Sequence, residues 1–384
     1  MRFAIMESVV TPGGHEIDFD RILVEELSAL GHTVEFYVPE GHEFKWNYGV
    51  PVHHIPGTGV SYRGAHGVKK LLLSAKREWH RQKWYKAMYD YAKQDAFDAI
   101  IFPSATYRYL RALQHNPLQN SPVPVLFLIH GATPNEAERL NAMAKKFDNR
   151  PNIRIGVQTF AKDKLHLTAK HLRVYGPPNY IPRDIECEPH FPAADEMLTI
   201  GFFGQYRREK NLESLLDAFL AGKYNRSVRL FIQGATQTAD DAADFERIIS
   251  KYKGNESMEF LHKPLIGIDW QKAIADVDAV AIPYGNERYL YHTSALISNA
   301  MGYQKPVIVA DNVNPEILKE YNIGMSFKNN DMEDLRTTLE VFINEYSENR
   351  TIYAGELTRA YNDYSPQNLA RNIVALANET YDNV

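Results

Sequence analysis

Short apolar runs rich in β-branched and aromatic residues alternate with amphipathic stretches along the whole chain of 384 residues. A short apolar run is typical of a buried strand, and apolar residues spaced three and four apart are typical of a helix that packs on a sheet. Their regular alternation indicates parallel sheets that are covered by helices. The sequence therefore predicts an α/β fold made of doubly wound, Rossmann-like domains.

The alternation forms two series. In the first, strands are expected near residues 2–6, 33–38, 50–55, 98–102, 123–129, 153–158 and 172–175, with helices at 16–30 and 67–94. In the second, strands are expected near residues 198–203, 228–233, 258–261, 279–283 and 307–310, with helices such as 212–221 and 293–302. The stretch 366–381 is helical by its period, and no strand is predicted after it.

Five prolines between Gly176 and Asp195 separate the two series. Each proline removes a backbone donor and fixes φ, so regular structure is not expected there. This segment is the predicted domain boundary, with a first domain at residues 1–180, a second at 181–365 and a final helix within 366–384.

Composition excludes several classes of protein. Lys and Arg number 43 and Asp and Glu 48, and the resulting net charge of −5 argues against a protein that coats nucleic acid with its whole surface. The single cysteine, Cys187, allows neither an intrachain disulfide nor a thiolate zinc site, and it fits a reducing compartment such as the cytoplasm. Glu7 interrupts the apolar core that a signal peptide needs, and the longest apolar runs are too short for a bilayer.

Two features of the first domain lie where ligands bind in doubly wound sheets, at the carboxyl edge. Gly13 and Gly14 stand between the first strand and a helix whose N-terminus favours anions, although their spacing is not G-x-G-x-x-G. A tight turn that needs glycine is the alternative interpretation. His130 ends the fifth strand and can donate to a sugar hydroxyl, unless it is a polar residue that simply ends a strand.

Cations gather near the start of the second domain, in LTIGFFGQYRREKN. Gly204 ends the strand, and Arg207, Arg208 and Lys210 follow before a helix, an arrangement that suits a diphosphate. A solvated charged loop is the alternative.

A second loop of this domain leads into a helix that opens with Thr293, Ser294 and Ala295. Threonine and serine are good caps, and the N–H groups next to them can hold a phosphate. Together with Lys210 they predict a pocket between two strand-to-helix loops.

At these residues the chain resembles a retaining GT-B glycosyltransferase of the large nucleotide-sugar-dependent family that includes bacterial polysaccharide enzymes, the family four-like glycosyltransferases. PGGHE resembles its first loop, LIHGA its cleft histidine and VYGPPNYIP its hinge. GQYRREKN aligns on G-R-x-x-x-x-K-G, and NAMGYQKPV aligns on E-A-x-x-x-G-K-P-V. The resemblance implies two Rossmann-like domains that face each other across a cleft, the first on the acceptor side and the second on the donor side. It also implies that the C-terminal helix packs back on the N-terminal domain.

The chain departs from the family at three donor-binding positions. Gln205 stands where the family has arginine, and Tyr291 and Asn299 stand where it has two glutamates eight residues apart. The resemblance implies that Asn299 accepts a hydrogen bond from the donor ribose, a task that an amide oxygen can perform. A tyrosine fills the role of the other glutamate less easily, and an inactive paralogue stays open.

The resemblance implies front-face transfer with retention and without a protein nucleophile. Lys210 and the adjacent arginines would stabilise charge on the leaving phosphate, and His130 would orient the sugar. No cofactor is expected beside a UDP- or GDP-linked donor. No metal is expected either, because the D-x-D strings Asp18–Asp20 and Asp276–Asp278 lie in a helix turn and before a strand and are interpreted as structural.

Nine Lys or Arg residues against two acids give a local charge of +7 between Arg63 and Lys93. Trp79, Trp84, Tyr85 and Tyr89 are interleaved with them. A basic, aromatic helix can lie on an anionic membrane surface, where a lipid-linked acceptor would be found. The alternative is a solvated helix whose aromatic side chains face the first domain.

The leading function is that of a hexosyltransferase which moves a sugar from a nucleotide diphosphate to a saccharide or lipid-linked acceptor in surface polysaccharide or glycoconjugate synthesis. The expected place is the cytoplasm or the inner face of the membrane. The alternatives are a nucleotide-sugar epimerase or hydrolase, and a non-catalytic binding protein of the same fold.

Overall fold

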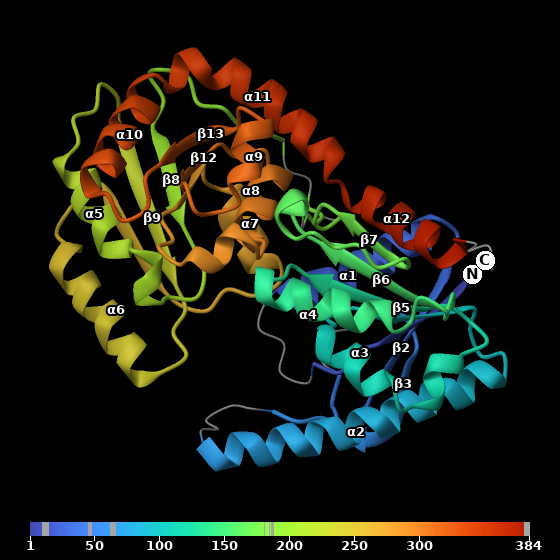
Figure 1. Cartoon of the computed structure of the whole chain (residues 1–384). Helices are drawn as coiled ribbons and strands as arrows, with labels where there is room; N and C mark the ends of the chain where they lie inside the picture. The colour runs from blue at the N-terminus through green and yellow to red at the C-terminus, as the bar shows by residue number, and fades with distance from the viewer. Residues whose placement is uncertain are drawn as a thin grey trace. The chain divides into compact units, whose positions relative to one another are not determined.

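The computed structural model describes residues 1–9, 15–44, 48–61, 67–179, 181–183, 185 and 188–379. The chain forms two compact units (Figure 1). Unit 1 comprises Met1–Pro177 and Pro366–Val384, and unit 2 comprises Pro178–Ser365. Each unit is built on a parallel sheet, which confirms the predicted α/β class with two Rossmann-like domains.

Unit 1 has a seven-stranded sheet in the order β3-β2-β1-β4-β5-β6-β7. The strands are β1 (Arg2–Met6), β2 (Thr33–Glu40), β3 (Val52–Thr58), β4 (Ala99–Phe102), β5 (Val125–His130), β6 (Ile153–Gln158) and β7 (Leu172–Tyr175). The helices are α1 (His15–Ala29), α2 (Gly67–Lys93), α3 (Tyr107–Leu113), α4 (Pro134–Lys145), α12 (Pro366–Asn378) and the 3₁₀ turns η1 (Pro117–Asn120) and η2 (Lys162–Lys164). The strand order reverses between β1 and β4.

Unit 2 has a six-stranded sheet in the order β10-β9-β8-β11-β12-β13. The strands are β8 (Leu198–Phe202), β9 (Val228–Gly234), β10 (Met258–His262), β11 (Ala279–Ile282), β12 (Val307–Ala310) and β13 (Gly324–Phe327). The helices are α5 (Leu212–Ala221), α6 (Ala239–Tyr252), α7 (Ile268–Ala275), α8 (Ala295–Gly302), α9 (Pro315–Glu320), α10 (Met332–Asn344), α11 (Tyr346–Asp363) and the 3₁₀ turns η3 (Arg208–Lys210) and η4 (Glu287–Leu290).

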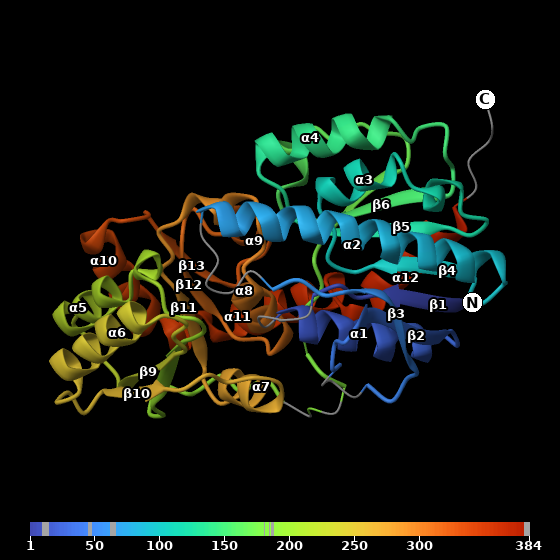
Figure 2. The ribbon, with the colours of Figure 1, turned by 90° about the horizontal axis from the view of Figure 1, so that it is seen from below.

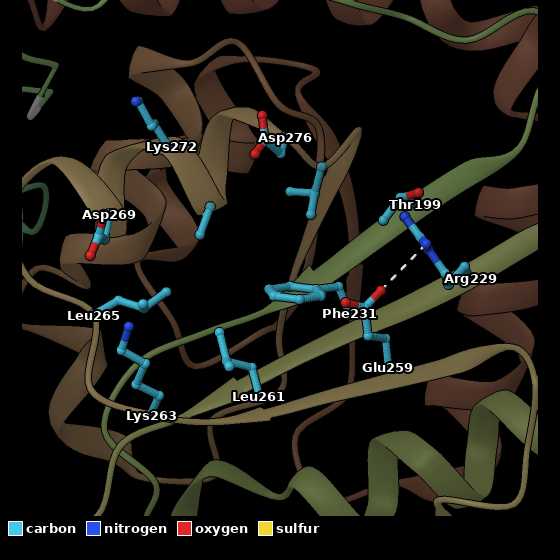
Figure 3. Close-up of a pocket in the computed structure, with 12 residues that line it drawn as sticks. Thr199, Arg229, Phe231, Glu259, Leu261, Lys263, Leu265, Asp269, Lys272 and Asp276 are labelled. Carbon is cyan, nitrogen blue, oxygen red and sulfur yellow. Dashed lines mark ion pairs between the residues drawn. The ribbon is translucent and has the colours of Figure 1, made fainter.

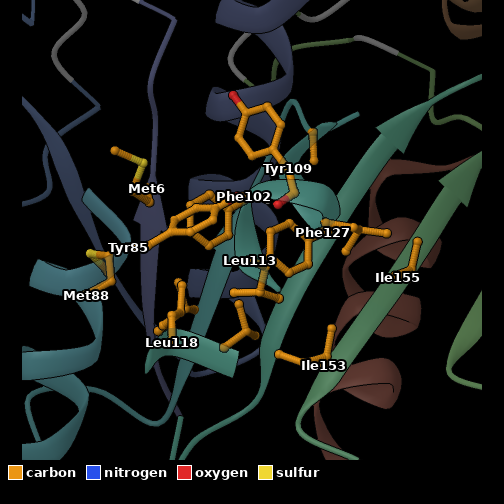
Figure 4. Packing of buried hydrophobic residues seen from close by; sticks show 14 of the residues in the cluster. Met6, Tyr85, Met88, Phe102, Tyr109, Leu113, Leu118, Phe127, Ile153 and Ile155 are labelled. Carbon is orange, nitrogen blue, oxygen red and sulfur yellow. Dashed lines mark hydrogen bonds between the residues drawn. The ribbon is translucent and has the colours of Figure 1, made fainter. Parts of the chain in front are cut away.

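The central strands of the sheet of unit 1 are buried on both faces, as their unbroken apolar runs require. Every residue of β4 and β6 is buried. On one face, Phe102 and Phe127 stack at a centroid distance of 4.9 Å, and Tyr85 of α2 meets Phe102 edge-on (Figure 4). The core of unit 1 therefore lies between this face and helices α2 and α3.

The other face of this sheet is covered by helices from opposite ends of the chain, α1 and α12 (Figure 1). Leu369, Ile373 and Leu376 are buried on α12 at the spacing of one helix face. Arg154 of β6 is also buried, and its Nη1 donates to the backbone carbonyl of Leu376. The segment after residue 365 thus completes unit 1 and not unit 2.

The observed elements differ from the predicted ones in two places that affect the site. Strand β13 was not predicted, because four residues at a sheet edge give too short a pattern. Helix α8 begins at Ala295 and not at Thr293, since Ser294 has the extended conformation of an N-cap (φ −75°, ψ 115°). Between Gly176 and Asp195 the described residues contain no helix or strand. In the described part of the chain, no helix is long and apolar enough to cross a membrane.

Candidate active site

The sheet of unit 2 reverses its strand order between β8 and β11. Figure 2 labels β11, β12 and β13, the strands on one side of this reversal. In open parallel sheets, ligands bind outside the carboxyl ends of the strands at such a reversal. The residues that follow β8 are Phe203 and Gly204, and those that follow β11 are Pro283 and Tyr284. The predicted donor loop and a polar, aromatic loop therefore start at the same point of the sheet.

Lys210 is the predicted site residue that points into this region. It is buried, its Nζ donates to the Phe203 carbonyl at 3.4 Å, and Nζ lies 4.6 Å from the centre of the Tyr284 ring. Within the described residues, no carboxylate forms an ion pair with it. Burial and the nearby Arg207 guanidinium lower the pKa of Lys210 to about 7. An anionic ligand would supply the opposite charge that this buried amine lacks.

Gly204 allows this placement of Lys210. Its φ of +105° is a conformation that residues with a Cβ rarely adopt, and an added Cβ would lie 3.1 Å from Lys210 Nζ. Its N–H donates to Gln233 Oε1 at 2.9 Å, and Gln233 Nε2 donates to the Lys263 carbonyl at 2.6 Å. The loop after β8 is thus fixed by the ends of β9 and β10.

The loops after β8 and β11 are also joined directly. The Gly285 N–H donates to the Glu209 carbonyl at 2.7 Å. The Tyr284 ring lies 5.0 Å from the Tyr289 ring, whose phenol has a pKa raised by burial and lowered in part by Arg207 and Arg288. The rings of Tyr284 and Tyr289 and the Arg207 and Arg288 guanidinium groups therefore lie near the backbone that follows β11.

The N-terminus of α8 is held by Asn314. Its Nδ2 donates to the Tyr289 carbonyl at 3.0 Å, and its Oδ1 accepts from the Ser294 N–H at 2.9 Å. The Ser294 N–H, predicted to contact phosphate, is therefore already bonded. The N–H groups of Ala295 and Leu296 have no hydrogen-bond partner among the described residues, as expected in a first helical turn.

The hydroxyl group of Thr293, the first residue of the predicted helix opening, is buried. Its Oγ1 has no hydrogen-bond partner in the described part of the chain. This oxygen and the two N–H groups that follow it are the polar atoms that the start of α8 leaves available.

The two predicted arginines lie differently from Lys210. Arg208 is exposed, and its Nε donates to Asp244 of α6 at 3.0 Å. Arg207 is also exposed, and its Nη2 donates to Gln205 Oε1 at 3.4 Å. Of these cations, Lys210 is buried beside the carboxyl ends of the strands, and Arg207 lies close enough to affect its charge.

Asn299 lies inside a polar network that the sequence did not reveal. It is 1% exposed, and its Nδ2 donates to Gln271 Oε1 of α7 at 3.2 Å. The Tyr303 hydroxyl donates to the same oxygen at 2.9 Å. With its amide nitrogen held in this way, Asn299 presents Oδ1 as its acceptor. Tyr291 is half-buried at the end of η4.

His130 lies in unit 1, at the carboxyl end of β5 as predicted. The ring is half-buried, its Nε2 contacts the Pro103 carbonyl at 2.7 Å, and it meets Phe19 edge-on at 4.5 Å. A carbonyl accepts only from the protonated nitrogen, so this contact assigns the proton of the neutral ring to Nε2. Gly13 and Gly14, and with them Arg63 and Cys187, lie outside the described residues.

The two D-x-D strings hold different partners. Asp18 pairs with Arg21 at 3.3 Å, and Asp278 accepts from the Thr199 N–H at 2.7 Å and contacts the His190 ring. In the described ranges, no group of three or more His, Cys, Asp or Glu residues is arranged to hold a metal ion.

A pocket of about 450 Å³ opens on one face of the sheet of unit 2, beside α7 (Figure 3). Phe231 and Leu261 lie at its base, and Arg229 and Glu259 form an ion pair of 3.4 Å at one end. The residues that line it include Asp276 and none of the predicted donor-site residues. The pocket is therefore separate from the residues around Lys210.

Comparison with known proteins shows which protein family most of unit 2 resembles. Residues 189–357 match the model of the family described as glycosyl transferases group 1. The chain is a glycosyltransferase, as the sequence predicted. No curated protein matches the chain in sequence.

Solved structures share the fold of the glycosyltransferase. HepE of Anabaena, in complex with UDP, has 15% identity and a TM-score of 0.65, with 97% of this chain and 98% of that chain covered. Sucrose-phosphate synthase from Thermosynechococcus elongatus has 14% identity and a TM-score of 0.67, with 98% of each chain covered. A glycosyltransferase from Rickettsia africae has 13% identity and a TM-score of 0.65, with 100% and 99% covered. At these identities the likeness supports the GT-B fold.

Sequence reasoning missed four residues that shape the site of this glycosyltransferase: Gln233, Gln271, Tyr284 and Asn314. A signal existed for two of them. Gln233 is a polar residue near the end of an apolar strand, and Asn314 precedes a proline at a helix start. Gln271 lies in an amphipathic helix, where nothing local distinguishes a buried amide from an exposed one.

Proposed function

We propose that the glycosyltransferase moves a hexose from a UDP- or GDP-linked donor to a saccharide or lipid-linked acceptor in surface polysaccharide or glycoconjugate synthesis. Unit 2 would bind the donor and unit 1 the acceptor. The proposed place is the cytoplasm, including the inner face of the membrane. The proposed reaction needs no cofactor and no metal ion.

The observation that carries this proposal is the buried amine of Lys210. Several kcal/mol is the usual cost of burying a charge without a partner, so a lysine held in this way requires a reason outside the apo fold. A diphosphate supplies two negative groups at the point where parallel sheets bind ligands. The N–H groups of Ala295 and Leu296 are further donors in the same unit.

In the proposed reaction, the bond between the anomeric carbon and the phosphate oxygen breaks with its electron pair on the phosphate. The acceptor oxygen forms a bond to the same face of that carbon, and its proton passes to the leaving phosphate. Lys210, protonated and near the phosphate, would stabilise the charge that develops there. His130 would orient the sugar, and Gly13 and Gly14 would let the ligand approach the backbone.

The remaining donor-binding residues are proposed to bind the nucleoside and sugar. Asn299 would accept from a ribose hydroxyl through Oδ1, because Gln271 holds its Nδ2. Tyr291 offers a hydroxyl and a ring face, which suit a sugar or base edge. Thr293, Ser294, Gln205, Arg207 and Arg208 would surround the phosphates, with smaller contributions from the two exposed arginines.

The test is donor-dependent release of nucleoside diphosphate from UDP-glucose, UDP-galactose and GDP-mannose, with and without saccharide acceptors. We expect release that requires an acceptor, and a product whose anomeric configuration by NMR equals that of the donor. Release at the same rate without acceptor would indicate a hydrolase. An absence of calorimetric binding for both UDP and GDP would contradict the proposed donor site.

Helix α2 supports the proposal of a membrane-associated acceptor. Val68, Leu71, Leu72 and Trp79 are 72%, 71%, 67% and 58% exposed, and they repeat at helical spacing. Lys69, Lys70 and Lys76 are exposed on the same turns, while Trp84 and Tyr85 are buried in the core. Trp84 and Tyr85 therefore face the core of unit 1, and the exposed N-terminal half of α2 is the proposed membrane-binding surface.

We expect the protein to bind phosphatidylserine vesicles at low salt and to dissociate as salt rises. Between about 0.1 M and 1 M salt, the screening length falls from about 10 Å to about 3 Å, which removes most of the attraction. Leu71→Ser together with Leu72→Ser should weaken binding at least about tenfold, because apolar area no longer enters the bilayer. The matched control is Ile266→Ser with Ile268→Ser, two exposed apolar residues of unit 2. Equal binding of both double variants would contradict a role for α2.

A further inference from the structure

Two buried carboxyl groups of unit 1 lie at the reversal of its sheet. Glu7 follows β1, the strand beside which the order reverses, and Asp20 lies in α1. Each residue is 4% exposed. The charges of the two groups affect one another, and Glu16 acts on both.

These carboxyl groups lack the partners that buried acids normally have. Glu7 Oε1 accepts from the Val9 N–H, but Oε2 has no hydrogen-bond partner among the residues that the structure describes. The Asp20 side chain has no hydrogen-bond or ion-pair partner among the described residues. An unpaired buried polar group costs about 1–3 kcal/mol, so two at one place need a reason.

The surroundings are polar and come from several elements. The Ser8 hydroxyl, next to Glu7, lies 2.7 Å from the hydroxyl of Tyr109 in α3. Phe19, next to Asp20, contacts the His130 ring at the end of β5. The carboxyl groups therefore belong to the edge where β1, β4 and β5 end, which is where a sheet of this kind binds its ligand.

Burial favours the protonated form of both groups. Burial raises the pKa of Glu7 to about 8, with Glu16 adding to the effect and the Arg77 guanidinium opposing it. Burial and the Glu7 and Glu16 charges raise the pKa of Asp20 well above its usual range. A protonated carboxyl group has one O–H donor and retains acceptor capacity, which matches a hydroxyl group.

We propose that Glu7 and Asp20 recognise the acceptor by exchanging hydrogen bonds with hydroxyl groups of a saccharide. This inference rests on the proposed function and adds the residues of unit 1 that select the acceptor. A neutral polyol is favoured over an ammonium group or a metal ion, since a cation would first have to displace the protons.

The test measures binding of the methyl glycosides of glucose, galactose and mannose by saturation-transfer NMR, using the full chain and the variants Glu7→Gln and Asp20→Asn. We expect at least one glycoside to bind the parent protein. Each variant should bind it about tenfold or more weakly, because an amide has a fixed donor nitrogen and a fixed acceptor oxygen, whereas a carboxyl group can carry its proton on either oxygen. Affinity for UDP should stay within twofold.

If the two carboxyl groups only stabilised the fold, Glu7→Gln and Asp20→Asn would lower the melting temperature. Because the carboxyl groups are buried without full partners, both variants should melt at the parent temperature or about 2 °C or more above it. Glu26→Gln is the matched control, since Glu26 is 2% exposed on the same helix and its Oε1 accepts from Gln367. We expect this control to leave glycoside binding unchanged.

Several outcomes would overturn the inference. They are a parent protein that binds none of the three glycosides, variants that bind them within twofold of the parent, and variants that melt several degrees lower. Binding of glucosamine or Mg²⁺, with release of protons and without glycoside binding, would assign the carboxyl groups to a cation. In all these cases, retained UDP binding and retained transfer would leave the proposed function intact.

Discussion

Replacing Lys210 by methionine is expected to lower kcat/KM for sugar transfer by about 10²–10³-fold, the usual effect of removing one preorganised donor from a developing negative charge. Methionine keeps the length and apolar character of the stem, so the packing against Tyr284 should survive. The fold should not suffer, because a buried amine without a carboxylate partner costs stability. Steady-state kinetics and thermal unfolding of the same preparations measure both effects.

The exposed arginine beside it provides the control. Arg207→Met should reduce kcat/KM much less, since this side chain is 44% exposed and its charge is screened by solvent. A Lys210→Met enzyme within twofold of the parent would remove Lys210 from the mechanism.

The pKa of Lys210 adds a pH signature to the same variant. At about pH 8 the apo amine is mostly neutral, because its pKa is about 7, so binding of UDP should take up a proton. Without ligand, the unfolded chain holds this proton up to its ordinary pKa of 10.5 while the folded chain loses it near 7, so the contribution of Lys210 to stability rises between these pH values. Calorimetry in buffers of different ionisation enthalpy should show proton uptake in the parent and not in Lys210→Met.

Gly324→Ala is expected to destabilise unit 2 by about 3 kcal/mol or more, with a fall in melting temperature of roughly 6–12 °C. An added Cβ would lie 2.0 Å from the Val307 carbonyl oxygen and 2.7 Å from its nitrogen. Val307 is the β12 residue paired with Gly324 in register, so the clash is with backbone that cannot rotate away. Loss of binding to UDP should accompany unfolding, because the donor site lies on the same sheet.

Gly254→Ala is the matched control, since no atom lies within 4 Å of a Cβ at that position. Thermal unfolding should leave this variant within about 1 °C of the parent. Hydrogen exchange in the peptides that cover β12 and β13 should increase in Gly324→Ala and not in the control. Equal exchange in both variants would show that the sheet adjusts to the added methyl group.

The two Rossmann-like folds were predictable because their signals are local. Strand β6 matches its predicted range of residues 153–158, because a strand buried on both faces needs an unbroken apolar stretch. β13 was missed because it is an edge strand of four residues in which Met325 and Ser326 are not fully buried. The true start of α8 depends on Asn314, which lies far along the chain.

The candidate site was predictable in part. Gly204 and Lys210 were found because a glycine and a cation after a strand are visible in a short window. Tyr284 was missed because its role is a contact with Lys210 and not a motif. Arg208 was expected beside the phosphate, but in the structure it forms an ion pair with Asp244 of α6.

The sequence by itself determined the class of fold, the succession of strands and the loops that lie at the carboxyl edges, because periodicity and glycine placement act over a few residues. The tertiary structure decided the state of each side chain in those loops. Burial and the distance to a partner set whether a charge is costly, and both depend on residues far away in the chain. Lys210 and Arg208 are two residues apart in sequence, yet one is a buried amine near its neutral form and the other is an exposed, paired cation.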